Sequence, residues 1–82
     1  MKFNEKMIYL REKSNKTQEE AAKEMGISRR TLQTYEYKEA EPTLNKLIKI
    51  AEYYNVSLDW LTGRTHNPEI NHEQLDHGKN VG

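Results

Sequence analysis

The sequence contains no cysteine, so neither disulfides nor thiolate metal sites can stabilise the fold. No stretch approaches the roughly 20 apolar residues that a membrane span needs, and the charged N-terminus lacks the apolar centre of a signal peptide. These absences predict a cytoplasmic protein with no membrane partner. An excess of charge is also missing, because 13 Lys and Arg balance 13 Asp and Glu. This balance argues against indiscriminate binding to polyanions.

The composition is that of one small globular domain. Hydrophobic residues make up 34% and charged residues 32% of the 82-residue chain, which is enough for a small core. Charge is unevenly spread: residues 1–34 hold eight Lys and Arg against five Glu, whereas residues 65–82 hold one Lys against three acids. A nucleic-acid surface, if present, is therefore expected in the N-terminal half.

The N-terminal segment has the apolar spacing of an amphipathic helix. Phe3, Met7 and Leu10 recur at steps of four and three residues. Asn4 is a suitable N-cap, and polar residues interrupt the pattern after Lys13. We therefore predict a first helix that runs to about Lys13.

Two short helices joined at a glycine are predicted next. Thr17 and Glu20 form a capping-box pattern at the start of one, and Gly26 ends it because glycine readily adopts left-handed conformations. Ser28 is a suitable N-cap for the other. The inward positions of the pair are predicted to be Ala21, Ala22, Met25, Thr31, Leu32 and Tyr35.

Two further helices complete the predicted fold. Thr43 and Ser57 are suitable N-caps, and Gly63 closes the last helix. The longer helix carries the strongest apolar stripe of the chain, formed by Leu44, Leu47, Ile48, Ile50, Ala51 and Tyr54. Because no strand alternation or internal repeat occurs, we predict an all-α fold with five helices.

Residues 65–82 have few large apolar side chains and are predicted to form a flexible tail after a domain of residues 1–64. His66, His72 and His77 lie in this tail without partner cysteines, so no metal site is predicted. The chain also lacks a nucleophile–base constellation and a phosphate-binding glycine loop. We expect no enzymatic activity, no cofactor and no small-molecule substrate.

The two short helices meet the physical requirements of a helix-turn-helix. Ala22 allows the helices to approach closely, and Gly26 allows the tight turn between them. Ile27, Leu32 and Tyr35 are spaced to anchor the second helix on the core. Its other face is then left to project outward.

This stretch resembles the Cro/CI-like phage repressor family, also called XRE-family regulators, from about Met7 to Gly63. The matching text is LREK, TQEEAA, MGIS, TLQTYE, a proline six residues after Glu36, and LIKIAEYYNVSLDWLTG. The resemblance implies a five-helix lambda-repressor-like DNA-binding domain, with its helix-turn-helix at about residues 17–36. In that family, the helix that begins at Ser28 is the recognition helix in the DNA major groove.

The resemblance assigns candidate DNA contacts to these helices. Positive charge at a helix start is unfavourable by roughly 0.3–1 kcal/mol, whereas a bidentate arginine contact to guanine gives roughly 1–3 kcal/mol of base discrimination. We therefore predict base contacts by Arg29 and Arg30, although exposed arginines are ordinarily solvated. Base contacts are also predicted for Gln33 and Thr34. Phosphate contacts are predicted for Gln18, Lys16, Thr31 and Lys38.

The resemblance also places Arg11 and Glu36 in a structural ion pair between the first and third helices. Such a pair makes Glu36 a structural rather than a catalytic residue. Glu39 and Glu41 occupy a loop that is often basic in the family. This departure predicts modest affinity for nonspecific DNA.

A single recognition helix reads few base pairs, so a homodimer on an inverted repeat is expected. The resemblance places the dimer contact near Val56, Leu58, Trp60 and Leu61, although all four could equally belong to the core. The predicted function is a transcriptional repressor that occupies double-stranded operator DNA. The alternative is a protein-interaction module on the same fold, such as an antitoxin or a regulator-binding subunit.

Overall fold

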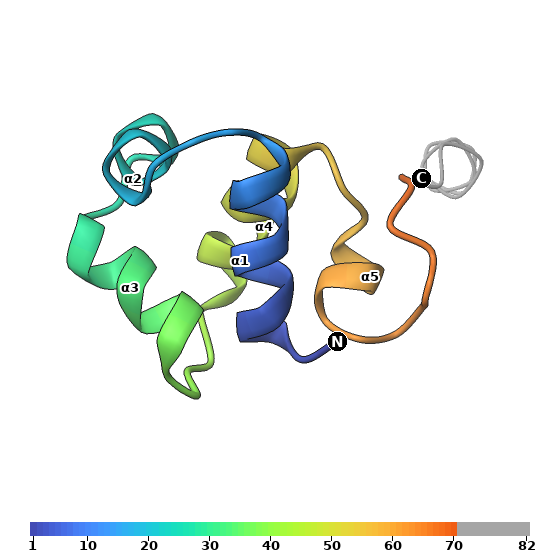
Figure 1. The fold of residues 1–82 in the computed structure, drawn as a ribbon. Helices are drawn as coiled ribbons and strands as arrows, with labels where there is room; N and C mark the ends of the chain where they lie inside the picture. The colour runs from blue at the N-terminus through green and yellow to red at the C-terminus, as the bar shows by residue number, and fades with distance from the viewer. Residues whose placement is uncertain (71–82) are drawn as a thin grey trace.

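The computed structural model describes residues 1–70 and places five α-helices in that range (Figure 1). They are α1 (Phe3–Lys13), α2 (Gln18–Met25), α3 (Arg29–Tyr37), α4 (Leu44–Tyr54) and α5 (Leu58–Leu61). No strand occurs among the described residues, and the predicted all-α, five-helix fold is confirmed. Within residues 1–70, no helix combines the length and the apolar character that crossing a membrane requires.

Side-chain caps fix the starts of four helices, as predicted. Thr17 Oγ1 accepts the Glu20 backbone N–H at 3.1 Å, and Glu20 Oε1 accepts the Thr17 backbone N–H at 3.0 Å. The hydroxyls of Ser28, Thr43 and Ser57 each accept a backbone N–H from three residues further on. Each bond pairs a donor that has no partner within its own helix.

The start of α1 differs from the prediction. Asn4 lies inside the first turn, and Lys2 is the N-cap residue. The Lys2 backbone N–H donates to Glu5 Oε1 at 2.7 Å. A carboxylate at the third helical position therefore pairs with the N-cap backbone, and the helix begins earlier than an Asn4 cap would allow.

The core is formed where the helices pack on one another. α1 packs against α3, α2 packs against α3 and α4, and α4 packs against α5. The buried apolar side chains are Met7, Leu10, Ala21, Ala22, Met25, Leu32, Tyr35, Ile50, Ala51, Trp60 and Leu61. The predicted apolar positions of α1, α2 and α3 supply most of this set.

The apolar stripe predicted on α4 is only partly buried. Ile50 and Ala51 are 2% and 6% exposed, whereas Leu44 and Ile48 are 64% and 37% exposed. At 100° per residue, Leu44 and Ile48 lie at the edge of the stripe. The neighbouring helices cover its centre and leave this edge in solvent.

A lysine that the sequence did not single out ties α1 to α5. The Lys6 side chain is buried, and its Nζ donates to the Trp60 carbonyl at 2.6 Å. The same ammonium lies 5.0 Å from the centre of the Trp60 ring, within range of a cation–π interaction. Lys6 therefore holds the C-terminal end of α5 against α1.

Candidate nucleic-acid interface

The turn between α2 and α3 positions the outer face of α3. Gly26 has φ +76° and ends α2 in a left-handed conformation. No atom lies within 4 Å of an added Cβ, so the backbone angle rather than space favours glycine. The Ile27 N–H donates to the Ala22 carbonyl at 3.0 Å. Leu32 is fully buried and fixes the inner face of α3, so the opposite face projects from the molecule (Figure 1).

Arg29 and Arg30 form the first turn of α3 and are exposed. Within residues 1–70, neither guanidinium forms a hydrogen bond or an ion pair. A shallow hollow at the start of α2 is lined by Arg11, Thr17, Gln18, Glu19 and Arg29. The fold therefore brings Arg29 beside the N-terminus of α2, where backbone N–H groups favour anions.

Gln18 and Gln33 contact each other across the two helices. Gln33 Nε2 donates to Gln18 Oε1 at 3.3 Å. Gln18 Nε2 donates to Glu36 Oε1 and to the Tyr37 hydroxyl, at 3.1 Å in each case. A predicted phosphate contact and a predicted base contact thus belong to one hydrogen-bonded group.

Glu36, which accepts a hydrogen bond from Gln18, also forms an ion pair with Arg11. Arg11 Nε is 2.8 Å from Glu36 Oε2, and Arg11 Nη2 donates to Glu36 Oε1 at 3.1 Å. The Glu36 side chain is fully buried, and its hydrogen bond raises the pKa of Arg11. Arg11 Nη1 also donates to the Lys16 carbonyl at 3.0 Å. The pair therefore joins α1, the segment before α2, and the end of α3.

The buried hydroxyl of Tyr54 has no hydrogen-bond partner among residues 1–70. Its pKa is raised to about 12, first by burial and then by the charge of Glu36. Both effects disfavour the phenolate, first because it would be buried and then because it would lie near the Glu36 carboxylate.

Three of the side chains predicted to contact DNA already have partners within the chain, namely those of Lys16, Thr31 and Thr34. Lys16 Nζ lies 3.2 Å from Glu24 Oε2, and both side chains are partly exposed. The Thr31 hydroxyl lies 2.8 Å from Ser28 Oγ. The Thr34 hydroxyl donates to the Arg30 carbonyl at 3.0 Å.

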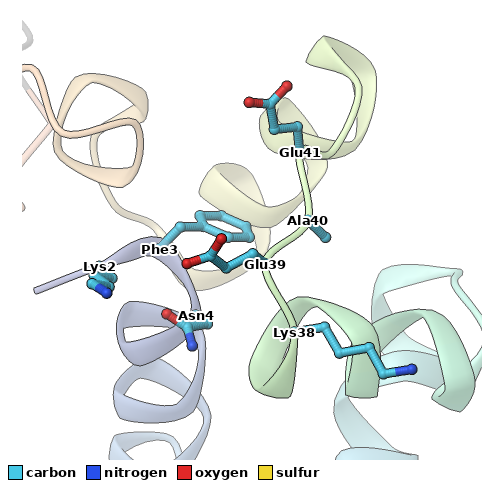
Figure 2. A pocket seen from close by; sticks show the side chains of 7 residues that line it. All are labelled: Lys2, Phe3, Asn4, Lys38, Glu39, Ala40 and Glu41. Carbon is cyan, nitrogen blue, oxygen red and sulfur yellow. The ribbon is translucent and has the colours of Figure 1, made fainter.

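Lys38 and the acidic loop line a hollow beside the start of α1. Figure 2 shows Lys38 extending away from Phe3, whereas the Glu39 side chain turns towards it. The hollow is lined by Lys2, Phe3, Asn4, Lys38, Glu39, Ala40 and Glu41. Lys38 is the exposed C-cap residue of α3, and in Figure 2 its side chain points away from that of Glu39.

The four residues predicted at the dimer contact divide between core and surface. Trp60 and Leu61 are 6% and 1% exposed and belong to the core. Val56 and Leu58 are partly buried and pack against its edge. Only Val56 and Leu58 of this set keep side-chain surface that a second chain could cover.

Tyr37 is a candidate interface residue that the sequence analysis did not select. It is 62% exposed at the last position of α3, and its hydroxyl contacts Gln18. Its spacing of four residues from Gln33 was the available signal, because it puts both side chains on one helix face.

The described residues offer no metal centre. Among residues 1–70, no three His, Asp or Glu side chains are grouped closely enough to hold an ion. His66 is exposed in this range, while His72 and His77 lie outside the described residues.

Residues 7–61 match the helix-turn-helix family. The chain is 42% identical over 64 residues to the transcriptional repressor RstR of the cryptic phage CTXphi from Vibrio cholerae, covering 78% of this chain and 57% of that protein. It is 32% identical over 75 residues to the HTH-type transcriptional regulator ImmR of Bacillus subtilis, covering 92% and 59%. An uncharacterized HTH-type transcriptional regulator of Methanocaldococcus jannaschii is 37% identical over 54 residues, covering 66% and 82%.

The chain spans less than two thirds of the length of RstR and ImmR. The matched region nevertheless includes most of every described helix, from Met7 in α1 to Leu61 in α5. The fold, the turn at Gly26 and this match agree: the chain belongs to the helix-turn-helix family, of the Cro/CI-like or XRE type.

Proposed function

We propose that this chain is a transcriptional repressor that binds operator DNA through α3. The observation that carries the proposal is the exposed pair Arg29 and Arg30 at the start of α3, without an ion-pair partner among residues 1–70. Helix stability does not explain two arginines at this position, because the helix dipole disfavours positive charge there. Bidentate contacts to guanine O6 and N7 would use both guanidinium groups.

The proposed DNA surface includes the start of α2. The hollow beside Arg29 and Gln18 opens at the α2 N-terminus, whose backbone N–H groups favour a phosphate. Lys38 adds an exposed cation at the other end of α3. Repression is proposed from the relative that is named a phage transcriptional repressor and is 42% identical to this chain. Operator DNA lies in the cytoplasm, where we place the protein.

The proposed assembly is a homodimer on an inverted repeat. One short recognition helix reads too few base pairs to define a unique site, and a two-fold axis doubles the number read. Val56 and Leu58 at the α4–α5 junction retain partly exposed apolar surface that supports a contact there.

Selection of bound duplexes from a random pool tests this function. We expect enriched sequences with two half-sites about 10–11 base pairs apart, and two protein chains per duplex by sedimentation. Affinity should fall steeply with salt because phosphate contacts release counterions. Binding of one chain to a single asymmetric site would contradict the dimer. Absence of any sequence preference, with a shallow salt dependence, would favour the protein-interaction alternative.

A further inference from the structure

We propose that a hollow between the start of α1 and the end of α5 binds a small organic monocarboxylate with an apolar chain, and that Lys6 holds its carboxylate. This inference goes beyond the proposed DNA-binding function and does not depend on it. Two observations carry it. One is a buried ammonium without a carboxylate partner among residues 1–70, and the other is the largely apolar hollow that this ammonium lines.

The burial of Lys6 is not matched by an ion pair. Its side chain is only 6% exposed, and lysine side chains are almost never buried to this extent unless they are paired. None of the ion pairs among residues 1–70 includes Lys6. A buried ammonium therefore lacks a counter-anion within the part of the chain that the structure describes.

The Lys6 ammonium also keeps hydrogen-bonding capacity for a ligand. An ammonium has three N–H donors. One of them donates to the Trp60 carbonyl at 2.6 Å, and the other two have no acceptor among residues 1–70. A carboxylate offers two acceptor oxygens and a negative charge, so it would supply both the acceptors and the counter-charge that Lys6 lacks.

The hollow that Lys6 lines has the size and the surface of a small-ligand site. Its volume is about 560 Å³, within the range of roughly 300–1,000 Å³ that is usual for such sites. The N-terminus of the chain lies beside α5, so both ends of the domain contribute to the walls (Figure 1). These walls are largely apolar and include Phe3, Pro42, Leu47 and Leu61. An apolar chain would be favourably removed from water on this surface.

The charges around the hollow favour a ligand with one negative charge. Lys2 and Lys6 line it together with one acid, Glu41. Two positive side chains and one negative side chain leave a net charge of +1. A single carboxylate balances this charge, whereas a dianion such as a phosphate monoester would leave negative charge in excess beside Glu41. We therefore assign the site to a monocarboxylate rather than to a phosphate.

Octanoate binding at pH 7 tests the proposal, because octanoate has one carboxylate and an unbranched apolar chain. Trp60 is the single tryptophan of the chain, and its ring centre lies 5.0 Å from the Lys6 ammonium. We expect octanoate to change Trp60 fluorescence in a saturable manner. It should also raise the melting temperature, because a ligand that binds the folded state stabilises it.

Two related compounds test the charge of the ligand on the wild-type protein. Octylammonium replaces the carboxylate by a cation and should bind about 10-fold more weakly or not at all, because it loses the hydrogen bonds to a charged group. Suberate carries a second carboxylate at the other end of an eight-carbon chain and should also bind more weakly than octanoate.

A matched pair of lysine variants tests the position of the site. Lys6→Met keeps an unbranched side chain but removes the ammonium, and should weaken octanoate binding by about 10- to 150-fold. Lys49→Met makes the same replacement at an exposed position of α4 outside this hollow and should leave the affinity unchanged. Melting with and without octanoate compares the variants, and circular dichroism shows whether each is folded.

The outcomes decide between the proposed site and a nonspecific apolar surface. Octanoate binding that Lys6→Met weakens and Lys49→Met does not supports the site. Absence of octanoate binding to the wild-type protein overturns it, as does equal binding of octanoate and octylammonium. If Lys6→Met does not fold, amide spectra of the wild-type protein replace it. Octanoate-dependent shifts at Leu47, Thr62 and Gly63, which line the hollow, support the site, and shifts confined to other residues overturn it.

Discussion

Arg29 and Arg30 carry positive charge at the end of α3 where the helix dipole disfavours it. Their neighbour Ser28 already caps the helix, so the arginines are not needed for its start. Their exposure also leaves the guanidinium groups available to a ligand. At the residue scale, folding and binding therefore make opposite demands on the same two positions.

Replacing Arg29 or Arg30 with alanine should separate these demands. The free energy of unfolding should hold or rise by roughly 0.3–1 kcal/mol, because a charge at the positive end of the dipole is removed. Affinity for the selected duplex should fall by about 1–3 kcal/mol for each bidentate arginine–guanine interaction that the substitution removes from a half-site. Urea denaturation and fluorescence anisotropy measure the two quantities.

Arg64→Ala is the matched control for these variants. Arg64 is 80% exposed beside Asp59. It follows α5, and Figure 1 shows α5 and α3 on opposite sides of α1. Its loss should leave base preference unchanged. If Arg29→Ala and Arg30→Ala both retain full affinity and the same preference, α3 does not read DNA as proposed.

Glu36 should matter mainly for stability. Its side chain is fully buried, and Glu36→Ala would leave Arg11 without its carboxylate partner. We expect a loss of roughly 3–5 kcal/mol in the free energy of unfolding, as for other buried pairs that lose one member. The double variant Arg11→Met/Glu36→Leu should be less destabilised, because it strands no charge. A cost for Glu36→Ala within the range of a surface pair, below about 1 kcal/mol, would contradict this expectation.

At the scale of the helices, the sequence predicted where a helix begins better than which of its faces is buried. The caps at Thr17, Ser28 and Thr43 depend on residues three positions away, so local sequence contains the whole interaction. Which face of α4 is buried depends instead on where α2 and α5 pack. Leu44 and Ile48 are apolar and helical in spacing, yet no local signal shows that they lie at an uncovered edge.

A carboxylate on α2 receives two donors that link it to other segments. Tyr53 in α4 donates its hydroxyl to Glu24 Oε1 at 2.6 Å, and Lys16 lies 3.2 Å from Glu24 Oε2. These partners, the tyrosine first, lower the pKa of Glu24 from its ordinary value of 4.5. The ionised carboxylate therefore stabilises the packing of α2 against α4.

The contribution of Glu24 should depend on pH in a defined direction. Because its folded-state pKa is the lower one, the stabilisation is fully present above pH 4.5, the ordinary value, and is lost as the pH falls through the folded value. We expect Tyr53→Phe to lower the free energy of unfolding at pH 7, and the gap from wild type to narrow towards pH 3. Urea denaturation across this range measures the gap. A gap that stays constant would show that the Tyr53 hydroxyl does not act through the Glu24 carboxylate.

For the whole molecule, the sequence was sufficient for the helix order and for the turn at Gly26. Spacing and composition did not predict bonds between residues far apart in the chain, because their partners are set only when the helices pack; the Arg11–Glu36 pair was predicted only through the family resemblance. Gln18 meets Tyr37 across 19 positions, and Lys6 meets Trp60 across 54. The first bond ties a side chain that was predicted to contact a phosphate to the end of α3. The second buries a charge that composition alone assigns to the surface.

The segment after α5 divides the predicted tail into two parts that should behave differently. The Pro68 carbonyl accepts the Ser57 backbone N–H at 2.8 Å, so residues 66–70 return to the start of α5.

A chain ending at Ile70 should melt within about 1 °C of the full chain, because the composition of residues 71–82 offers little that could pack. A chain ending at Thr65 loses the Ser57 bond, worth about 0.5–1.5 kcal/mol. At about 4–8 °C per kcal/mol in a domain of this size, the melting temperature should fall by about 2–12 °C. Thermal denaturation followed by circular dichroism compares the three chains, with sedimentation to record their oligomeric state. Equal melting of both truncations would show that the Pro68 contact contributes nothing, and dissociation of a dimer on removal of residues 71–82 would assign that segment to the interface.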